Sequence, residues 1–82
     1  MSLSQIEYFV AVADAGHVGR AAEKLRIAQP AVSRQIRNLE GELGAKLFDR
    51  TPRGMKLSAS GEIFLEHARA ILDRVARART LR

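Results

Sequence analysis

Hydrogen-bonding side chains cluster in the stretch AQPAVSRQI, residues 28–36, where Gln29, Ser33 and Arg34 stand among small apolar residues. Pro30 lies inside this stretch, and proline is accepted in the first turn of a helix because its missing N–H would have no partner there. We therefore expect a helix to begin at Gln29 or Pro30. The positive end of its dipole, together with these donors, suits the binding of an anionic group such as a phosphate.

The polar residues of this helix share one face. At about 100° per residue, the apolar stripe consists of Val32, Ile36, Leu39 and Leu43. The opposite face consists of Pro30, Ser33, Arg34, Arg37 and Gly41. Arginine binds guanine through two hydrogen bonds or pairs with a phosphate, and glutamine binds adenine. An apolar back and a hydrogen-bonding front are typical of a recognition helix in a DNA major groove.

We therefore predict a recognition helix over residues 30–43 that lies in the major groove of double-stranded DNA. Its predicted contacts come from Gln29, Pro30, Ser33, Arg34 and Arg37. Gly41 lowers the helix propensity of the segment, but it also removes a side chain where the helix passes close to another surface. The alternative interpretation is a solvated helix face without a partner.

A second basic cluster surrounds a predicted turn at residues 51–54. The sequence Thr-Pro-Arg-Gly at these positions has turn chemistry, and residues 47–48 and 55–57 are expected to form short strands. A short, stiff, basic hairpin suits a wing, residues 50–56, that contacts the DNA backbone or the minor groove. Its predicted contacts come from Arg50, Thr51, Arg53 and Lys56. An ordinary solubilising turn is the alternative.

Two shorter helices must hold the recognition helix in place. The first is predicted from apolar residues at helical spacing, namely Leu3, Ile6, Phe9, Val10 and Ala13. A capping box begins at Ser4, with Ser2 as the alternative cap, and Gly16 ends the helix. Tyr8 and Val12 lie off the main apolar face, where they are either exposed or in contact with a second surface. The second helix is expected over residues 18–25.

A long amphipathic helix is predicted from Ser58 or Ser60, one of which caps it, to the end of the chain. Its apolar stripe is longer than a small core can cover, and such a stripe usually finds a partner helix. We predict that Phe64 packs on the chain's own core while the second half pairs with another copy. The predicted dimerisation residues are Phe64, Leu65, Ala68, Ile71, Leu72 and Val75. Packing of the whole stripe on the chain's own core is the alternative.

The predicted order is helix, helix, turn, helix, hairpin, long helix, which is the order of a winged helix-turn-helix with an added helix. The fold class is therefore mainly α, with three helices and a two-stranded β-wing followed by a long dimerisation helix. We assign residues 1–58 to the DNA-binding unit and residues 59–82 to the linker and dimerisation helix. A dimer would recognise a two-fold symmetric DNA site.

Composition narrows the classes of protein that the chain can represent. Its 82 residues suffice for one domain with a modest core, and its formal net charge of +5 favours polyanions such as nucleic acid. The absence of cysteine excludes disulfides and thiolate metal sites and fits a reducing cytoplasm. No long apolar run indicates a membrane span, and no signal peptide is evident at the N-terminus.

Three other classes of function fit the sequence less well. We expect no enzyme, because His17 and His67 are isolated and no thiol, carboxylate pair or glycine-rich loop is present. The last helix is amphipathic like a membrane-surface helix, but its polar face mixes acids and bases. A pure dimerisation module would leave the polar face of the third helix without a function.

The chain resembles the DNA-binding domain of LysR-type transcriptional regulators. The resemblance rests on LSQIEYFVAVADAG, on RAAEKLRIAQPAVSRQIRNLEGELGAKLFDR and on RGMKLSASG, and it covers nearly the whole chain. It implies a bacterial or archaeal transcription factor that binds inverted repeats with a T…A signature. It also implies dimers joined by antiparallel linker helices.

The resemblance assigns roles by position. Gln29, Pro30, Ser33 and Arg34 match residues at the base-contacting end of the family's recognition helix, Arg37 matches a variable position that often makes a contact, and Arg50 and Arg53 match the wing. Two positions depart from the common pattern. Ala28 stands where many members have a capping serine, and His17 stands near a position that is often Ser or Thr. We include His17 among the residues expected to contact the DNA backbone.

The resemblance also implies partners beyond this chain. Full-length members carry a C-terminal effector-binding domain, so a small-molecule co-inducer would bind there, and we expect no cofactor in this fragment. The implied assembly is a homodimer through the C-terminal helix and a tetramer in the full-length protein. The expected partners are an inverted-repeat operator and RNA polymerase, with no membrane, and the expected location is the bacterial cytoplasm at the nucleoid.

Overall fold

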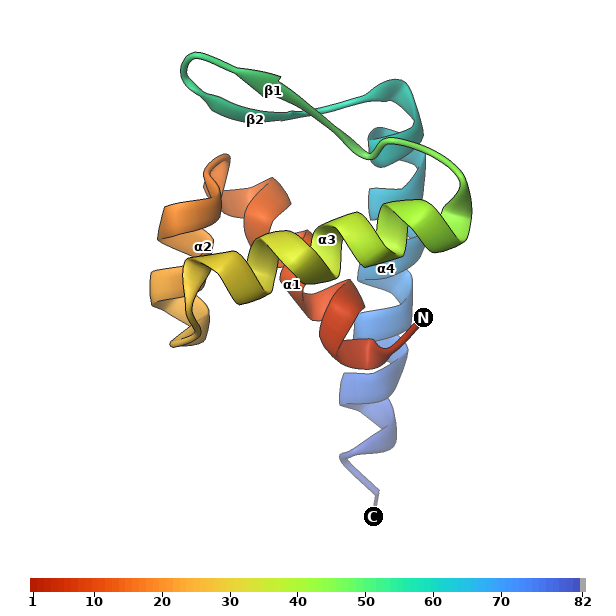
Figure 1. The fold of residues 1–82 in the computed structure, drawn as a ribbon. Coiled ribbons are helices and arrows are strands. Elements are labelled where there is room, and N and C mark those ends of the chain that lie inside the picture. The colour runs from red at the N-terminus through yellow and green to blue at the C-terminus, as the bar shows by residue number, and fades with distance from the viewer. Residues whose placement is uncertain (82) are drawn as a thin grey trace.

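The structure is a computed structural model that describes residues 1–81, and its elements follow the predicted order (Figure 1). The elements are α1 Leu3–Ala15, α2 Val18–Leu25, α3 Gln29–Leu43, β1 Phe48–Thr51, β2 Gly54–Leu57 and α4 Ala59–Ala78. Helices α1, α2 and α3 pack on one another, the antiparallel hairpin lies over them, and α4 runs past α1. The predicted mainly-α winged helix-turn-helix with a long final helix is confirmed.

The capping box of helix α1 begins two residues earlier than expected, at Ser2 and not at Ser4. The Ser2 hydroxyl accepts a hydrogen bond from the Gln5 backbone N–H at 3.1 Å, and the Gln5 side chain accepts one from the Ser2 N–H at 3.2 Å. The prediction of a cap at Ser4 is therefore wrong, and the alternative at Ser2 is right. Both serines precede a suitable partner by three residues, but the earlier start adds backbone bonds such as Ile6 N–H to the Ser2 carbonyl.

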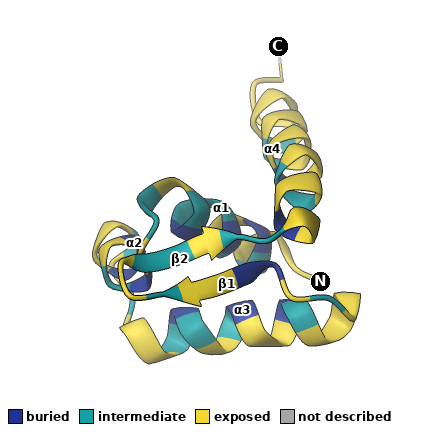
Figure 2. Ribbon diagram, turned by 90° about the horizontal axis from the view of Figure 1, so that it is seen from above, coloured by how far each residue is buried: buried dark blue, intermediate teal, exposed yellow. Residues whose placement is uncertain are grey.

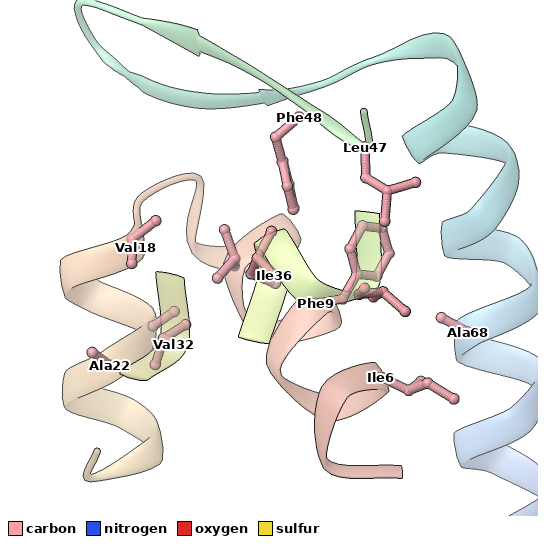
Figure 3. Packing of buried hydrophobic residues seen from close by; sticks show 12 residues of the cluster. Ile6, Phe9, Val18, Ala22, Val32, Ile36, Leu47, Phe48 and Ala68 are labelled. Atoms are coloured by element: carbon pink, nitrogen blue, oxygen red, sulfur yellow. The ribbon is translucent and has the colours of Figure 1, made fainter. Parts of the chain in front are cut away.

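The core lies where α1, α3 and the first residues of the hairpin meet (Figure 3). Its largest fully buried side chains are Phe9, Leu39, Leu47, Val12 and Val32. Val12 has no exposed surface, so the alternative of contact with a second surface is the right one. It belongs to the core because helices α2 and α3 pack against α1 in addition to α4, so α1 buries a wider face than one stripe.

Two apolar residues at helix ends are exposed instead of buried. Leu3 in the first turn of α1 is 43% exposed, and Leu43 in the last turn of α3 is 37% exposed. Both were expected on the buried stripes of their helices. Each stripe continues beyond the neighbouring elements, and a side chain at the end of a helix then lacks neighbours on one side.

An aromatic cluster joins α4 to the rest of the domain. The ring of Phe9 lies 5.2 Å from that of Phe48 and 5.0 Å from that of Phe64, the latter pair edge to face. Ala68, one turn beyond Phe64, is fully buried against the same core. The first half of α4 is thus held by the chain's own core.

The start of α4 is fixed to the start of the hairpin by Ser58. Its hydroxyl accepts a hydrogen bond from Gly61 N–H at 2.9 Å and donates one to the Lys46 carbonyl at 2.7 Å. A side chain at Gly61 would overlap the Leu47 carbonyl oxygen, so glycine permits this close packing. Ser58 is therefore the cap, and Ser60 is not.

The second half of α4 projects away from the other elements and is largely exposed (Figure 2). In this half Ile71 is 36% exposed, and Leu72 and Val75 are partly exposed. One ion pair, Arg69 to Asp14 at 2.6 Å, joins the polar side of α4 to α1, and this hydrogen bond raises the pKa of Arg69. Over residues 1–81, none of the helices combines the length and apolar character needed to cross a membrane.

Candidate nucleic-acid interface

The N-terminus of α3 is open to an external partner. Pro30 lies in the first turn, and the residue before the helix, Ala28, makes no side-chain capping hydrogen bond. Most helices use a Ser, Thr, Asp or Asn side chain to bind an N–H group at this point. Ala28 leaves this end of α3, with its positive dipole, uncovered by a cap.

The predicted polar face of α3 lies on the surface. Gln29, Pro30, Arg34 and Arg37 are exposed and Ser33 is half-buried, while the stripe on the other side of the helix packs into the core. Within residues 1–81, the guanidinium groups of this face form no ion pair. Both are thus available to an anion from outside the chain.

Gln35 does not belong to this polar face; its side chain contacts α1. Its side-chain oxygen accepts a hydrogen bond of 3.0 Å from the side chain of Gln5 on α1. The pair is partly buried and joins residues 30 positions apart. Gln35 therefore helps to hold α3 against α1.

Glu40 joins α3 to the hairpin, a role that the sequence pattern did not indicate. One carboxylate oxygen accepts hydrogen bonds from the backbone N–H groups of Leu47 at 2.7 Å and Phe48 at 3.3 Å. These bonds fix the beginning of β1 relative to α3. Glu40 also lies beside Arg37, because both residues line a hollow between α3 and the hairpin.

The hairpin is held at its other end by the turn between α1 and α2. The Met55 N–H donates a hydrogen bond of 3.0 Å to the Gly16 carbonyl. Gly54 has a φ of +136°, and a side chain there would overlap the same carbonyl oxygen. Glycine is required at position 54 for both reasons, and the wing has a set position over the helices.

His17 caps α2 and lies beside the start of α3. Its Nδ1 accepts a hydrogen bond from the Gly19 N–H at 3.0 Å, so in this arrangement the ring proton is on Nε2 and can be donated outward. The absent side chain of Gly19 leaves room for both the His17 ring and the Gln29 side-chain oxygen, which lie 3.0 and 3.3 Å from the position its Cβ would take. His17 and Gln29 are thus brought together.

Hydrogen-bond donors from three elements surround one hollow of about 330 Å³. The groups that line it include His17, Gln29, Arg50, Thr51 and Arg53. A smaller hollow of about 130 Å³ lies between α3 and the hairpin, where three cations, Arg37, Lys46 and Arg50, line it together with Ser33 and one carboxylate, Glu40. The wing and the recognition helix therefore form one continuous basic surface, with Arg50 shared between the two hollows.

Two of the predicted wing residues differ from the rest. The Thr51 hydroxyl donates to the Gly54 carbonyl at 3.1 Å and accepts from the Arg53 N–H at 3.3 Å, so it shapes the turn. Lys56 is exposed opposite Asp49 in the hairpin register and lines neither hollow.

Among residues 1–81, no group of three or more His, Cys, Asp or Glu side chains is placed to hold a metal ion.

Comparison with protein families gives one match to this chain. The model described as bacterial regulatory helix-turn-helix protein, lysR family, matches residues 3–62. The HTH-type transcriptional regulator TfdT of Cupriavidus pinatubonensis is 52% identical over 94% of this chain and 34% of its own length. The HTH-type transcriptional regulator ClcR of Pseudomonas putida is 51% identical over 88% of this chain and 24% of its own length.

Solved structures with the same fold include DNA complexes. The CbnR_DBD–DNA complex superposes with a TM-score of 0.91 and 45% identity, over 95% of this chain and 90% of that one. The BenM_DBD/catB site 1 DNA complex gives 0.94 and 42% identity, over 98% and 90%. The curated relatives are transcriptional regulators and not enzymes, and this chain spans about a quarter to a third of the length of those reported above.

Proposed function

This chain belongs to the lysR family of bacterial regulatory helix-turn-helix proteins, and on that premise we propose how it recognises DNA as the DNA-binding domain of a LysR-type transcriptional regulator. The polar face of α3 enters the major groove of double-stranded DNA, and the wing lies against the adjoining backbone. The observation that carries this proposal is the continuous basic surface formed by α3, the α1–α2 turn and the hairpin.

Base contacts are proposed for the exposed face near the N-terminus of α3. Arg34 is fully available there, and its planar guanidinium can bind the two acceptors of a guanine. Gln29, Pro30, Ser33 and Arg37 complete the set of major-groove contacts. The uncapped N-terminus of α3, where the helix dipole is positive, attracts a phosphate of the DNA backbone next to the contacted bases.

Backbone contacts are proposed for Arg50, Arg53 and His17, which surround the hollow of about 330 Å³. Donors from separate elements can bind one phosphate there, with His17 using its Nε2–H. Lys56 adds a longer-range attraction from an exposed position on β2. We leave Thr51 out of the contact set, because its hydroxyl is already used in the turn.

We also propose a homodimer through the second half of α4, with residues 1–58 as the DNA-binding unit and 59–82 as the linker and dimerisation helix. The apolar side chains on this half would bind the same helix of a second copy. The proposed contacts are Ile71, Leu72 and Val75 from this half, together with Leu65 from the first half of the helix. Phe64 and Ala68 are left out, because the Phe64 ring packs edge to face on Phe9 and Ala68 is fully buried, whereas Leu65 and Leu72 pack on the core and keep part of their surface exposed.

A shallow hollow of about 130 Å³ between α1 and α4 extends this apolar surface. Leu3, Leu72 and Val75 line part of it, which gives the exposed Leu3 a partner in the dimer. Two copies related by a two-fold axis would present their recognition helices to the two halves of an inverted repeat.

The longer relatives support further proposals about the whole protein. A C-terminal domain of the full-length protein would bind a small-molecule co-inducer and complete a tetramer on DNA. Such a regulator would contact RNA polymerase at the promoter and act in the bacterial cytoplasm at the nucleoid.

Selection from random duplexes followed by a salt titration tests the proposal. The selected sites should contain an inverted repeat, and binding measured by fluorescence anisotropy should weaken steeply as salt rises, because each neutralised phosphate adds about 0.9 to the slope of log K against log salt. A selected pool without common sequence would contradict specific recognition. Binding that does not change with salt would contradict the DNA-binding surface itself.

A further inference from the structure

Gly41 lies inside α3 although the fold of this chain does not require glycine there. A Cβ added at this position would meet no atom within 4 Å, and Gly41 is not among the residues with positive φ. Gly54 and Gly61 differ, because a Cβ at either would overlap a backbone oxygen. Glycine is among the least favourable residues in a helix interior, so the reason for Gly41 lies outside the chain.

Gly41 is on the face of α3 that is proposed to meet DNA. At about 100° per residue, it falls within about 40° of Pro30, Arg34 and Arg37. The 15 residues of α3 span roughly 22 Å, whereas the major groove is about 12 Å wide. A helix of this length whose axis crosses the groove at an angle extends beyond it, so its last turns would then pass one sugar-phosphate backbone.

The surroundings of Gly41 are concave and carry positive charge. A shallow hollow of about 380 Å³ is lined by two cations, Arg37 and Lys46, by one carboxylate, Glu40, and by Gly41, Gly44 and Ala45. Neither cation has an ion pair within residues 1–81. Their two charges outweigh the roughly half negative charge at the C-terminal end of the helix dipole.

The acidic residues that flank Gly41 are engaged within the chain. Glu40 accepts two backbone hydrogen bonds from the start of β1. Glu42 pairs with the terminal amino group of Met1 at 2.7 Å. The hollow therefore carries two cations against one lining carboxylate, and one oxygen of that carboxylate already binds two internal N–H groups.

We propose that this hollow is a binding site for the DNA sugar-phosphate backbone, in which Gly41 allows the backbone to approach α3 closely and Lys46 binds a phosphate. Arg37 lies on the groove side of the same site. The inference rests on the proposed function, and it adds Gly41 and Lys46, at and beyond the C-terminal end of α3, to the contacts proposed for the N-terminal end.

Gly41→Ala and Gly41→Leu test the close approach. Both variants should raise the urea midpoint of unfolding, because the added side chain meets no protein atom and favours the helix. Both should nevertheless weaken DNA binding, with Gly41→Leu losing roughly tenfold or more, as expected when a close contact is overfilled. Ala70→Leu, at an exposed position on the polar side of α4, is the matched control and should leave affinity unchanged.

Lys46→Ala tests the phosphate contact. Its affinity for selected and random duplexes should fall by the same factor, and the salt slope should decrease by about 0.9. Wild-type affinity in the Gly41 variants, or an unchanged salt slope in Lys46→Ala, would overturn this inference while wild-type DNA binding still supports the proposed function. Failure of the wild-type chain to bind DNA would instead refute the proposed function.

Discussion

Replacing Gly54 by alanine should separate the position of the wing from its charge. The added methyl group would overlap the Gly16 carbonyl oxygen, so the hairpin must move by roughly 1 Å or more to reach the usual separation of about 3.5 Å between non-bonded atoms. The bond from Met55 N–H to that carbonyl, now 3.0 Å, would then exceed the limit of a hydrogen bond. Arg50 and Arg53 would move with the hairpin although neither residue is changed.

The expected cost in stability follows from two contributions. The lost backbone hydrogen bond contributes about 1 kcal/mol, and a side chain at a φ of +136° adds about 1–3 kcal/mol of strain. Gly54→Ala should therefore lower the free energy of unfolding by about 2–4 kcal/mol. Gly41→Ala is the matched substitution without a clash, and it should raise the free energy of unfolding instead.

DNA binding by folded Gly54→Ala protein is the decisive measurement. Two wing cations that lose their phosphates reduce the salt slope by about 1.8, which is also the reduction expected for the double variant Arg50→Ala/Arg53→Ala. The two slopes should therefore agree when measured by anisotropy well below the urea midpoint. A wild-type salt slope in Gly54→Ala would show that contact with Gly16 does not position the wing, and the reasoning would be wrong.

The remaining predictions concern base contacts and the dimer. If Arg34 binds a guanine, Arg34→Ala should lose about 1–3 kcal/mol of binding free energy on a selected site and less on random duplexes. Arg34→Lys should restore binding to random duplexes but not the additional affinity for the selected site. Equal losses on both kinds of duplex would make Arg34 a phosphate contact. Ile71→Glu and Val75→Glu should shift the sedimentation of the chain from dimer to monomer, because each places a charge on the apolar side of α4 that is proposed to bind a second copy. The control Ala70→Leu should sediment as a dimer. Unchanged sedimentation of the two Glu variants would refute the dimer surface.

Local signals in the sequence were sufficient to predict most helix ends. Gly16 and Gly44 end α1 and α3 in the left-handed conformation, and Pro30 stands in the first turn of α3 as expected. These signals act within a few residues, so they do not depend on the rest of the fold. The start of α1 was wrong by two residues because Ser2 and Ser4 both satisfy the capping pattern.

Burial was less predictable, because it depends on which elements pack against a helix. Periodicity leaves Val12 either exposed or in contact with a second surface, and the structure shows the second, whereas Leu3 and Leu43 lie on apolar stripes and are exposed. Helical periodicity identifies one face, but a helix packed against several neighbours buries more than one face. A helix end that extends past its neighbours buries less.

The amino-acid sequence by itself determined the order of the elements, the polar face of α3 and the basic hairpin, because these depend on spacing and turn chemistry along the chain. Only the tertiary structure decided which polar groups are free for DNA. Gln35 and Glu40 are used to hold α3 to α1 and to the hairpin, and Gly54 fits against Gly16, 38 positions earlier. Contacts between residues so far apart in the sequence produce no periodic pattern along the chain. Only the folded structure therefore shows which polar side chains hold the domain together and which remain free on its surface.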